Sequence, residues 1–504
     1  MSAAQVPPTG ESKEYFEQRA LKQGAGGWVL LAGLGVAYVI SGDFSGWNNG
    51  LATGGFGGLL IAFILMGIMY LFMIFGLAEL SSALPTAGAG YGFARRAFGR
   101  LGGYMTGVAI LIEYVIAPAA ISVFICDYVR SIFGWANDPL LNIGIMAVFW
   151  VVFIGIQLIG AGEALKTIFV ITAIAVVALV VYVIAIIPHF DASQLLNMAP
   201  DGSLGSSDFL PKGIGGALST LVFGIWFFLG IEGVPLAAEE AKDPKKDMPR
   251  GLIIGMLCLL VFGALMLFLT PGGTINPIAS DNPGLCQDIA DANNGVITGT
   301  GSFLIGCGGA PLVLALQSAG LPEWVWYFVN IAGLAGLVAS FFSLTFGASR
   351  QMFALSRAGY LPRAISKTSS RKVPTWCLLI PGIIGFALGG SLQSGARLID
   401  IAVFGATVSY VMMCASHVWL RLKDKELHRE YLTPGGAVTT GIATVLAVIA
   451  VIAVFNMDPL AAGITLGVFV VLIAYFLLYS SKKVVGNAPE EEFAAIAAAE
   501  EELN

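Results

Sequence analysis

Three carboxylates lie inside long apolar stretches of this 504-residue chain, where an unpaired charge is costly. Asp43 lies between Gly42 and Phe44, Glu113 precedes Tyr114, and Glu232 lies between Ile231 and Gly233. A carboxylate surrounded by hydrocarbon is stable when it pairs with a cation or holds a proton. These residues therefore indicate a site that binds an ammonium group or a proton.

The sequence lacks the residue patterns of the common enzyme classes. It contains no P-loop, no His-Glu-x-x-His motif, no Cys/His metal spacing and no glycine fingerprint of a nucleotide site. Its histidines, His189, His417 and His428, lie near the ends of apolar segments or in loops and do not cluster for general-base chemistry. We therefore expect no catalysis, no cofactor, no bound metal and no nucleic-acid partner.

Lipid is the expected environment of most of the chain. Hydrophobic residues make up 57% of it and charged residues 12%, with a mean hydropathy of +0.83, which is too apolar for a soluble protein. A bilayer core of about 30 Å needs about 20 apolar residues per helix, and this rule predicts an all-α membrane protein with twelve spans. The predicted spans are 27–51, 56–83, 101–127, 140–159, 165–187, 213–238, 250–271, 325–349, 374–391, 395–420, 436–456 and 459–481.

The distribution of basic residues predicts the orientation in the membrane. If the N-terminus is cytoplasmic, every Lys and Arg falls on the inner side except Arg130, Lys212 and Arg397, as expected for short cytoplasmic loops. We therefore expect both termini in the cytoplasm and a multi-pass protein of the plasma membrane, the inner membrane in a bacterium.

The long external loop contains a further apolar segment, 302–320, which we exclude from the spans. Gly306, Gly308, Gly309 and Pro311 interrupt it, so we expect a re-entrant or surface helix. The same loop holds Cys286 and Cys307, which leaves a disulfide open as an alternative to two free thiols.

Two predicted spans carry a glycine-rich, polar interruption near their middle. The first has Ser41-Gly42-Asp43-Phe44-Ser45-Gly46, and the sixth has Gly230-Ile231-Glu232-Gly233. Non-helical backbone at membrane depth is tolerated where protein or a cavity surrounds it, and broken helices at corresponding positions of two halves indicate a transport site.

Each interruption opens a group of five spans, which fits two five-helix repeats of opposite topology followed by two extra helices. We expect a cytoplasmic segment 1–26, one transporter domain 27–481 and an acidic cytoplasmic tail 482–504. Within the domain the expected parts are 27–187 (first repeat), 213–420 (second repeat) and 436–481 (helices eleven and twelve).

Two longer motifs resemble the amino acid–polyamine–organocation superfamily. One runs from Gly230 through Ala238-Glu239-Glu240-Ala241-Lys242-Asp243-Pro244 to Arg250, and the other from Ser349 to Pro362. The resemblance implies a five-plus-five inverted repeat with alternating access. Asp43 followed by Trp47-Asn48-Asn49, together with Glu113-Tyr114, is most similar to the ethanolamine permeases of this superfamily.

The resemblance also implies how a solute binds. In amino-acid carriers of the family, amides of the first broken helix are expected to hold the substrate carboxylate, and carbonyls of the sixth the amine. Asp43 beside those amides would repel an anionic group. We therefore expect a small amine without a carboxylate, ethanolamine first, with Asp43 pairing its ammonium. The alternatives are an amino-acid permease that tolerates Asp43 and, less favoured, a channel.

Other polar and aromatic residues complete the expected site. The hydroxyl of ethanolamine would bind Ser41, Ser45 or Asn48, and the Trp226-Phe227-Phe228 run would face the ammonium. The candidate substrate-binding residues are Asp43, Ser41, Gly42, Ser45, Gly46, Glu113, Trp226, Phe227, Gly230 and Glu232.

Structural alternatives stay open for several of these residues. Asp43 could cap the second half-helix, and Glu232 could act in gating or in structure. The aromatic run could simply pack in the core, and Gly42 and Gly46 have the GxxxG spacing of closely packed helices.

The coupling ion stays open at this stage. Some proton-coupled members carry a lysine in the fifth span where this chain has Ala175. The remaining alternatives are facilitated diffusion, a proton on Asp43, Glu113 or Glu232, and a sodium site with hydroxyls such as those of Ser343 and Thr345.

Overall fold

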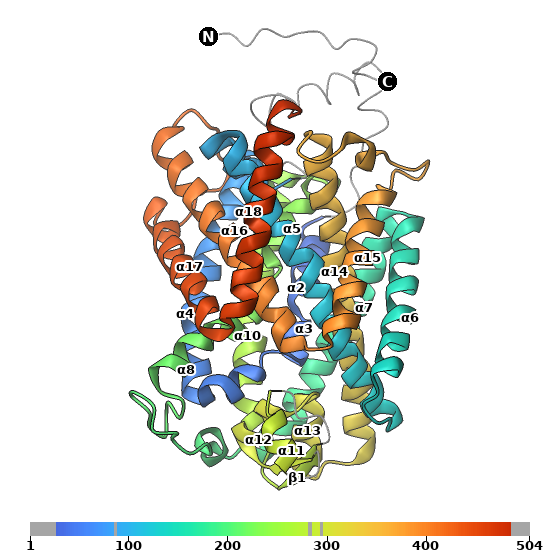
Figure 1. The fold of residues 1–504 in the computed structure, drawn as a ribbon, viewed down its shortest axis with the longest axis vertical. Coiled ribbons are helices and arrows are strands. Elements are labelled where there is room, and N and C mark those ends of the chain that lie inside the picture. Colours follow the sequence, from blue (N-terminus) through green and yellow to red (C-terminus); the bar gives the residue numbers. More distant parts are fainter. Residues whose placement is uncertain (1–26, 85–87, 281–284, 293–295, 485–504) are drawn as a thin grey trace.

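The computed structural model describes residues 27–84, 88–280, 285–292 and 296–484. The expected N-terminal segment 1–26 and residues 485–504 of the expected tail lie outside this part of the chain. The described part forms a bundle of long helices that run up and down between two ends of the molecule (Figure 1). Eleven of its helices are long and apolar enough to cross a membrane, so the chain is an all-α, multi-pass membrane protein.

The unbroken spans are single helices whose ends differ from the predicted ones by up to about a dozen residues. The largest difference is at α5, which begins at Gly90 instead of 101, because the basic segment before the span is itself helical up to a kink at Gly99. These helices are α4 (Asn49–Ala83), α5 (Gly90–Phe133), α6 (Pro139–Ile159), α7 (Ala161–Ile186), α10 (Pro244–Gly272), α14 (Glu323–Arg357), α15 (Thr375–Leu392), α16 (Gly395–Lys423), α17 (Ala437–Met457) and α18 (Pro459–Leu478).

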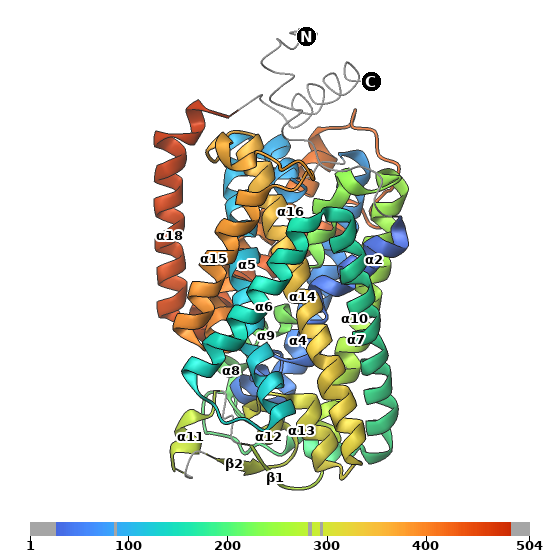
Figure 2. The same ribbon diagram turned by 90° about the vertical axis from the view of Figure 1, so that its right-hand side faces the viewer.

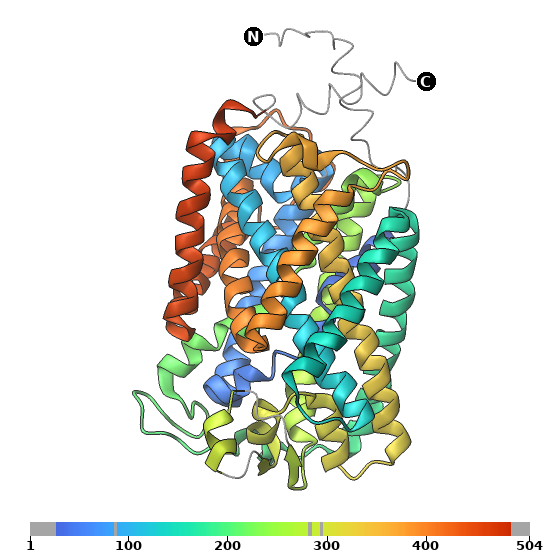
Figure 3. The ribbon, with the colours of Figure 1, turned by 45° about the vertical axis from the view of Figure 1, so that its right-hand side comes forward.

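The two predicted broken spans are divided in the structure. The first consists of α2 (Trp28–Val39) and the four-residue α3 (Ser41–Phe44), and α4 begins only at Asn49. The sixth consists of α8 (Gly213–Ser219), α9 (Leu221–Trp226) and the 3-10 helix η3 (Ile231–Glu240). Both breaks lie among the other helices of the bundle and not at its ends (Figures 1 and 3).

The loop between α10 and α14 folds into a small cap at one end of the bundle. It contains α11 (Gln287–Ala292), α12 (Gly301–Cys307), α13 (Pro311–Ser318) and an antiparallel pair of strands, β1 (Ile278–Ser280) and β2 (Ile297–Gly299). Cys286 and Cys307 form a disulfide within it. The segment 302–320 is therefore two short helices in this cap, not a membrane span (Figure 2).

The opposite end of the bundle collects the basic loops. Arg96, near the start of α5, forms an ion pair with Asp424, just after α16, at 2.7 Å. Lys245, at the start of α10, lies 3.3 Å from Glu430. The remaining short helices are η1 (Ile187–His189), η2 (Ala192–Leu196), η4 (Arg363–Ser366) and η5 (Ser480–Lys482).

Candidate functional site

The first span begins to depart from a regular helix where a serine of α14 inserts into it. The Ser41 N–H donates to Ser340 Oγ at 2.9 Å, and the Ser340 hydroxyl donates in turn to the Ala37 carbonyl at 2.7 Å. The serine hydroxyl thus replaces the helical hydrogen bond between residues 41 and 37. A side chain inserted into the hydrogen-bond ladder is a recognised cause of helix breaks.

The segment that is not helical is Ser45–Asn48, which follows Asp43 in the chain and lies between α3 and α4. Ser45 is extended (φ −162°) and Gly46 has φ +92°, a left-handed conformation that favours glycine. The freed carbonyls are occupied: Tyr128 Oη donates to Phe44 O at 2.9 Å, and Trp226 Nε1 donates to Ser45 O at 3.0 Å. Side chains from α5 and α9 therefore satisfy the broken backbone, as membrane depth requires.

The GxxxG spacing of Gly42 and Gly46 reflects close packing as well as unwinding. A Cβ at Gly42 would lie 2.7 Å from the Trp226 carbonyl oxygen, and one at Gly46 would collide with the Trp226 indole nitrogen. The first broken helix is thus pressed against the end of α9, where the sixth span breaks.

The break in the sixth span lies between α9 and η3. Gly230 there has φ +107°, and its N–H donates to Glu232 Oε2 at 3.2 Å. Glu232 Oε1 accepts a hydrogen bond from Tyr114 Oη at 3.1 Å. Glu232 therefore stabilises the broken backbone of its own span and connects it to α5 through Tyr114.

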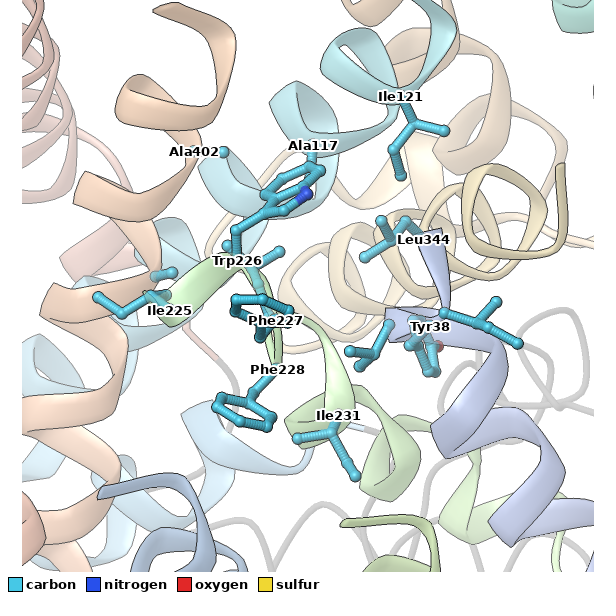
Figure 4. Packing of buried hydrophobic residues seen from close by; sticks show 14 of the residues in the cluster. Tyr38, Ala117, Ile121, Ile225, Trp226, Phe227, Phe228, Ile231, Leu344 and Ala402 are labelled. Carbon is cyan, nitrogen blue, oxygen red and sulfur yellow. The ribbon is translucent and has the colours of Figure 1, made fainter. Parts of the chain in front are cut away.

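The aromatic run at the end of α9 packs against other rings in the core. The ring of Phe227 lies 5.4 Å from Trp47 and 5.1 Å from Phe63, centroid to centroid. Trp226 lies close to Ala117 of α5 and Ala402 of α16 (Figure 4). Each ring of the run is buried, so in this conformation the run fits the packing alternative.

Asp43 is buried at 1% exposure, and neither of its carboxylate oxygens has a hydrogen-bond partner in the described part of the chain. The ion pairs of the described residues do not include it either. The capping role is therefore not realised in this structure. A buried carboxylate without a partner is costly, and pairing with a cation or binding a proton removes that cost.

Glu113 and Glu232 occupy a different place, where polar side chains from several elements meet. Tyr410 Oη of α16 donates to Glu113 Oε1 at 3.3 Å, and Tyr70 Oη of α4 donates to Tyr410 Oη at 2.7 Å. The two carboxyl groups also contact each other, side chain to side chain. Within the described residues, no side-chain hydrogen bond joins Asp43 to this cluster.

A cavity of about 220 Å³ lies between the unwound segment and the loop cap. Ser45 and Asn48 line it, but Asp43 does not. Ser45 Oγ donates to Gly309 O at 3.2 Å, and Asn48 Nδ2 donates to Ile305 O and Gly308 O at 2.9 and 2.8 Å. These two predicted solute ligands therefore hold the cap against the unwound segment in this structure.

The two hydroxyl groups named for a sodium site, those of Ser343 and Thr345, donate hydrogen bonds to backbone carbonyls in this structure. Ser343 Oγ donates to Ala339 O and Thr345 Oγ1 to Phe342 O, at 2.7 and 2.9 Å, both within α14. Ala175 is buried on α7 and faces Gly336 of α14. A Cβ added at Gly336 would lie 3.3 Å from the Ala175 Cβ and would collide with the Phe44 ring.

Sequence reasoning missed the partners that surround the candidates. Ser340, Tyr70, Tyr128 and Tyr410 lie on helices far along the chain from the residues they bind. A hydroxyl in an apolar span was the signal available, but many spans of this chain carry one.

Comparison with known proteins places the chain among permeases. Residues 29–487 match the family described as amino acid permease. The branched-chain amino acid permease BcaP of Bacillus subtilis is 28% identical over 84% of this chain and 87% of its own length. BcaP of Lactococcus lactis is 25% identical over 68% and 72%. The methylthioribose transporter of Bacillus subtilis is 25% identical over 80% and 82%.

Proposed function

Because this chain belongs to the amino acid permease family, and is thus a transporter and not an enzyme, we propose that it carries a small amine-bearing solute by alternating access. The observation that carries this proposal is Asp43, a buried carboxylate of the first broken helix that has no hydrogen-bond partner among the described residues. The ammonium group of the solute is the cation that Asp43 lacks. A bound ammonium removes the cost of an isolated charge in a low-dielectric site.

An amino acid is the first candidate for that solute. Two relatives that cover most of the chain are named as branched-chain amino acid permeases. The methylthioribose transporter, at a similar identity, carries a solute of another chemical class. Family membership alone therefore leaves the substrate to the residues of the site.

Ethanolamine is the second candidate, and the backbone of the first break favours it. A carboxylate needs free N–H donors, but the nearby amides are engaged: Ser41 N donates to Ser340, Ser45 N to Ser41 O and Gly46 N to Asn48 Oδ1. Asp43 adds a negative charge at the same place. A solute with an amine and no carboxylate meets neither obstacle.

The contacts of the unwound segment suggest which end of the carrier opens. Ser45 and Asn48 hold the loop cap, and Trp226 holds Ser45 from the other side. Release of these hydrogen bonds would connect the cavity under the cap with the first break. We propose that this is the opening step for solute entry from the cap side.

We propose the plasma membrane, the inner membrane in a bacterium, as the site of action, with the cap outside and both termini in the cytoplasm. The concentration of Lys and Arg in the loops at the end opposite the cap supports this orientation. A disulfide in the cap fits an oxidising exterior.

The test is counterflow into liposomes that contain the purified full-length protein. Liposomes are loaded with unlabelled ethanolamine, alanine, leucine, choline or propionate, and entry of labelled solute is followed. Exchange of amines but not of propionate supports the proposal. Strong exchange of leucine and alanine with none of ethanolamine selects the amino acid, and the converse selects ethanolamine. The absence of exchange with every amine would contradict the proposal.

A further inference from the structure

Two carboxyl groups meet in the interior of the bundle, and no hydrogen bond joins Asp43 to them in the described part of the chain. Glu113 comes from α5 and Glu232 from η3, and their side chains are 0% and 3% exposed. The Tyr114 hydroxyl, on the residue next to Glu113 in α5, donates to Glu232 at 3.1 Å, and the two carboxyl groups lie close enough for their side chains to interact. Two ionised carboxylates this close together inside a membrane protein would repel each other strongly.

The groups that face this pair are tyrosines. Tyr114 donates to Glu232, Tyr410 donates to Glu113, and Tyr70 donates to Tyr410. Tyr38 of α2 stacks on Tyr114 with ring centroids 5.9 Å apart. In the described part of the chain, neither carboxyl group forms an ion pair with Lys, Arg or His.

A bound proton would remove the repulsion between the two carboxylates, which no cationic side chain neutralises among the described residues. An ionised carboxylate only accepts hydrogen bonds, so two carboxylates can bond to each other only when one is protonated. Without that proton Glu113 Oε2 has no hydrogen-bond partner. Like charges at a shared buried site do not both ionise readily.

We propose that the Glu113–Glu232 pair is the binding site of a coupling proton. The proposal rests on the function proposed above, because coupling has meaning only if a solute is carried. Glu232 belongs to the broken sixth span, and it also accepts the Gly230 N–H. A movement of η3 relative to α5 separates the two carboxyl groups, and the shared proton leaves when they part. Protonation of the pair is thereby tied to the position of the broken helix.

The sign of the coupling follows from this geometry. A proton that enters with the solute links inward transport to a proton gradient directed inward. For one proton per solute, a gradient of one pH unit sustains about tenfold accumulation. The Glu113→Gln change keeps the size of the side chain and donates a hydrogen bond permanently. The variant therefore resembles the protonated pair, but the substituted side chain can no longer take up or release a proton.

The test uses the full-length protein in liposomes, with the membrane potential clamped and a pH gradient imposed. The labelled solute is whichever compound shows counterflow in the experiment described under the proposed function. Liposomes without protein measure passive entry. We expect the wild type to accumulate it about tenfold per pH unit. Glu113→Gln and Glu232→Gln should retain counterflow but reach the same level at every gradient.

Asp400→Asn is the matched control. Asp400, on α16, is also buried with no hydrogen-bond partner for its carboxylate oxygens among the described residues, but unlike Asp43 it lies in an unbroken helix, and it is outside the pair. This variant should accumulate solute as the wild type does. Thermal unfolding of each purified variant identifies a folding defect, and the two Gln variants serve as independent tests.

Three outcomes would overturn the proposal: wild-type counterflow without accumulation, gradient-driven accumulation by a folded Glu113→Gln protein, or loss of accumulation in Asp400→Asn alone. Counterflow that is absent with every solute would refute the proposed function, and the coupling proposal with it. Counterflow that persists without coupling refutes only the coupling.

Discussion

Asp43 and Glu232 are buried acidic residues at the two broken helices, but their surroundings differ. Asp43 accepts no hydrogen bond in the described structure. Glu232 accepts hydrogen bonds from Tyr114 and Gly230 and contacts Glu113. The first environment lacks a cation, and the second is complete once one proton is present. Under the two proposals made above, the two breaks bind different ligands: a solute at the first and a proton at the second.

Another buried carboxylate, that of Glu79, has a structural role. Glu79 of α4 is 0% exposed and lies 2.7 Å from Arg421, 2.9 Å from Arg429 and 3.2 Å from His417. The Thr433 N–H also donates to it at 2.8 Å. This group joins α4 to α16 and to the segment before α17. Its charge is already matched, so no ligand is needed.

The largest effect is expected for Asp43→Asn. Loss of a buried charge partner costs about 3–5 kcal/mol, so uptake of the amine should fall about 100-fold or more. Because Asp43 has no hydrogen-bond partner to lose among the described residues, and an unpaired buried charge is costly, the thermal stability should not fall below that of the wild type. Uptake into liposomes and thermal unfolding are measured together, with Asp400→Asn as the control. Wild-type uptake by Asp43→Asn would remove the distinction between the two breaks.

Glu79→Ala should act on stability instead of solute recognition. It leaves Arg421, Arg429 and His417 without their common anion, and breaking a buried ion pair costs about 3–5 kcal/mol. Denaturant unfolding of the detergent-solubilised protein should show the loss, while the protein that remains folded keeps its solute affinity. A stable Glu79→Ala protein with altered affinity would place Glu79 in the transport mechanism.

Gly46→Ala tests whether the first break needs its backbone conformation. The left-handed φ of +92° costs a residue with a Cβ about 1–2 kcal/mol, and the Cβ meets the Trp226 indole. Both stability and transport should decline. Gly441→Ala in α17 is the control, since a Cβ there has no neighbour within 4 Å, and it should not decrease either quantity because Ala favours a helix more than Gly. Equal behaviour of the two variants would mean that the segment relaxes freely.

The smallest effect is expected for Tyr410→Phe. It removes one hydrogen bond to Glu113, worth about 1 kcal/mol, which favours the ionised form of the pair. The pH at which gradient-driven uptake is half-maximal should therefore move upward by about one unit or less. Tyr182→Phe removes a comparable buried hydrogen bond, to Thr270, and should leave the pH profile unchanged. A shift in both variants would indicate a general packing effect.

The helices and both breaks could be predicted from the sequence because lipid imposes a simple rule. Long apolar runs must become helices, and a glycine-flanked carboxylate inside one, as at Asp43 and Glu232, violates that rule visibly. The break in the first span lay further along than Gly42 and Asp43 suggested. The carbonyls of that unwound part are held by Tyr128 and Trp226, and no local pattern reveals contacts across 84 and 181 residues.

The composition of the site was harder to predict for the same reason. Trp226, Ser45 and Asn48 were expected to face the solute, but each binds another part of the protein in this structure. The interaction between Glu113 and Glu232 joins residues 119 positions apart in the chain. Sequence reasoning identified both acids, but it could not show that they share one place while Asp43 lies elsewhere.

The most direct test of the central claim is solute binding to purified wild-type and Asp43→Asn protein, followed as the ligand-induced shift in unfolding temperature. Ethanolamine, alanine, leucine and propionate are compared at equal concentrations, because a ligand that binds the native state raises that temperature. We predict that an amine stabilises the wild type, that propionate does not, and that the shift disappears in Asp43→Asn. An undiminished shift with the amine in the Asp43→Asn protein would contradict the claim that Asp43 binds the solute.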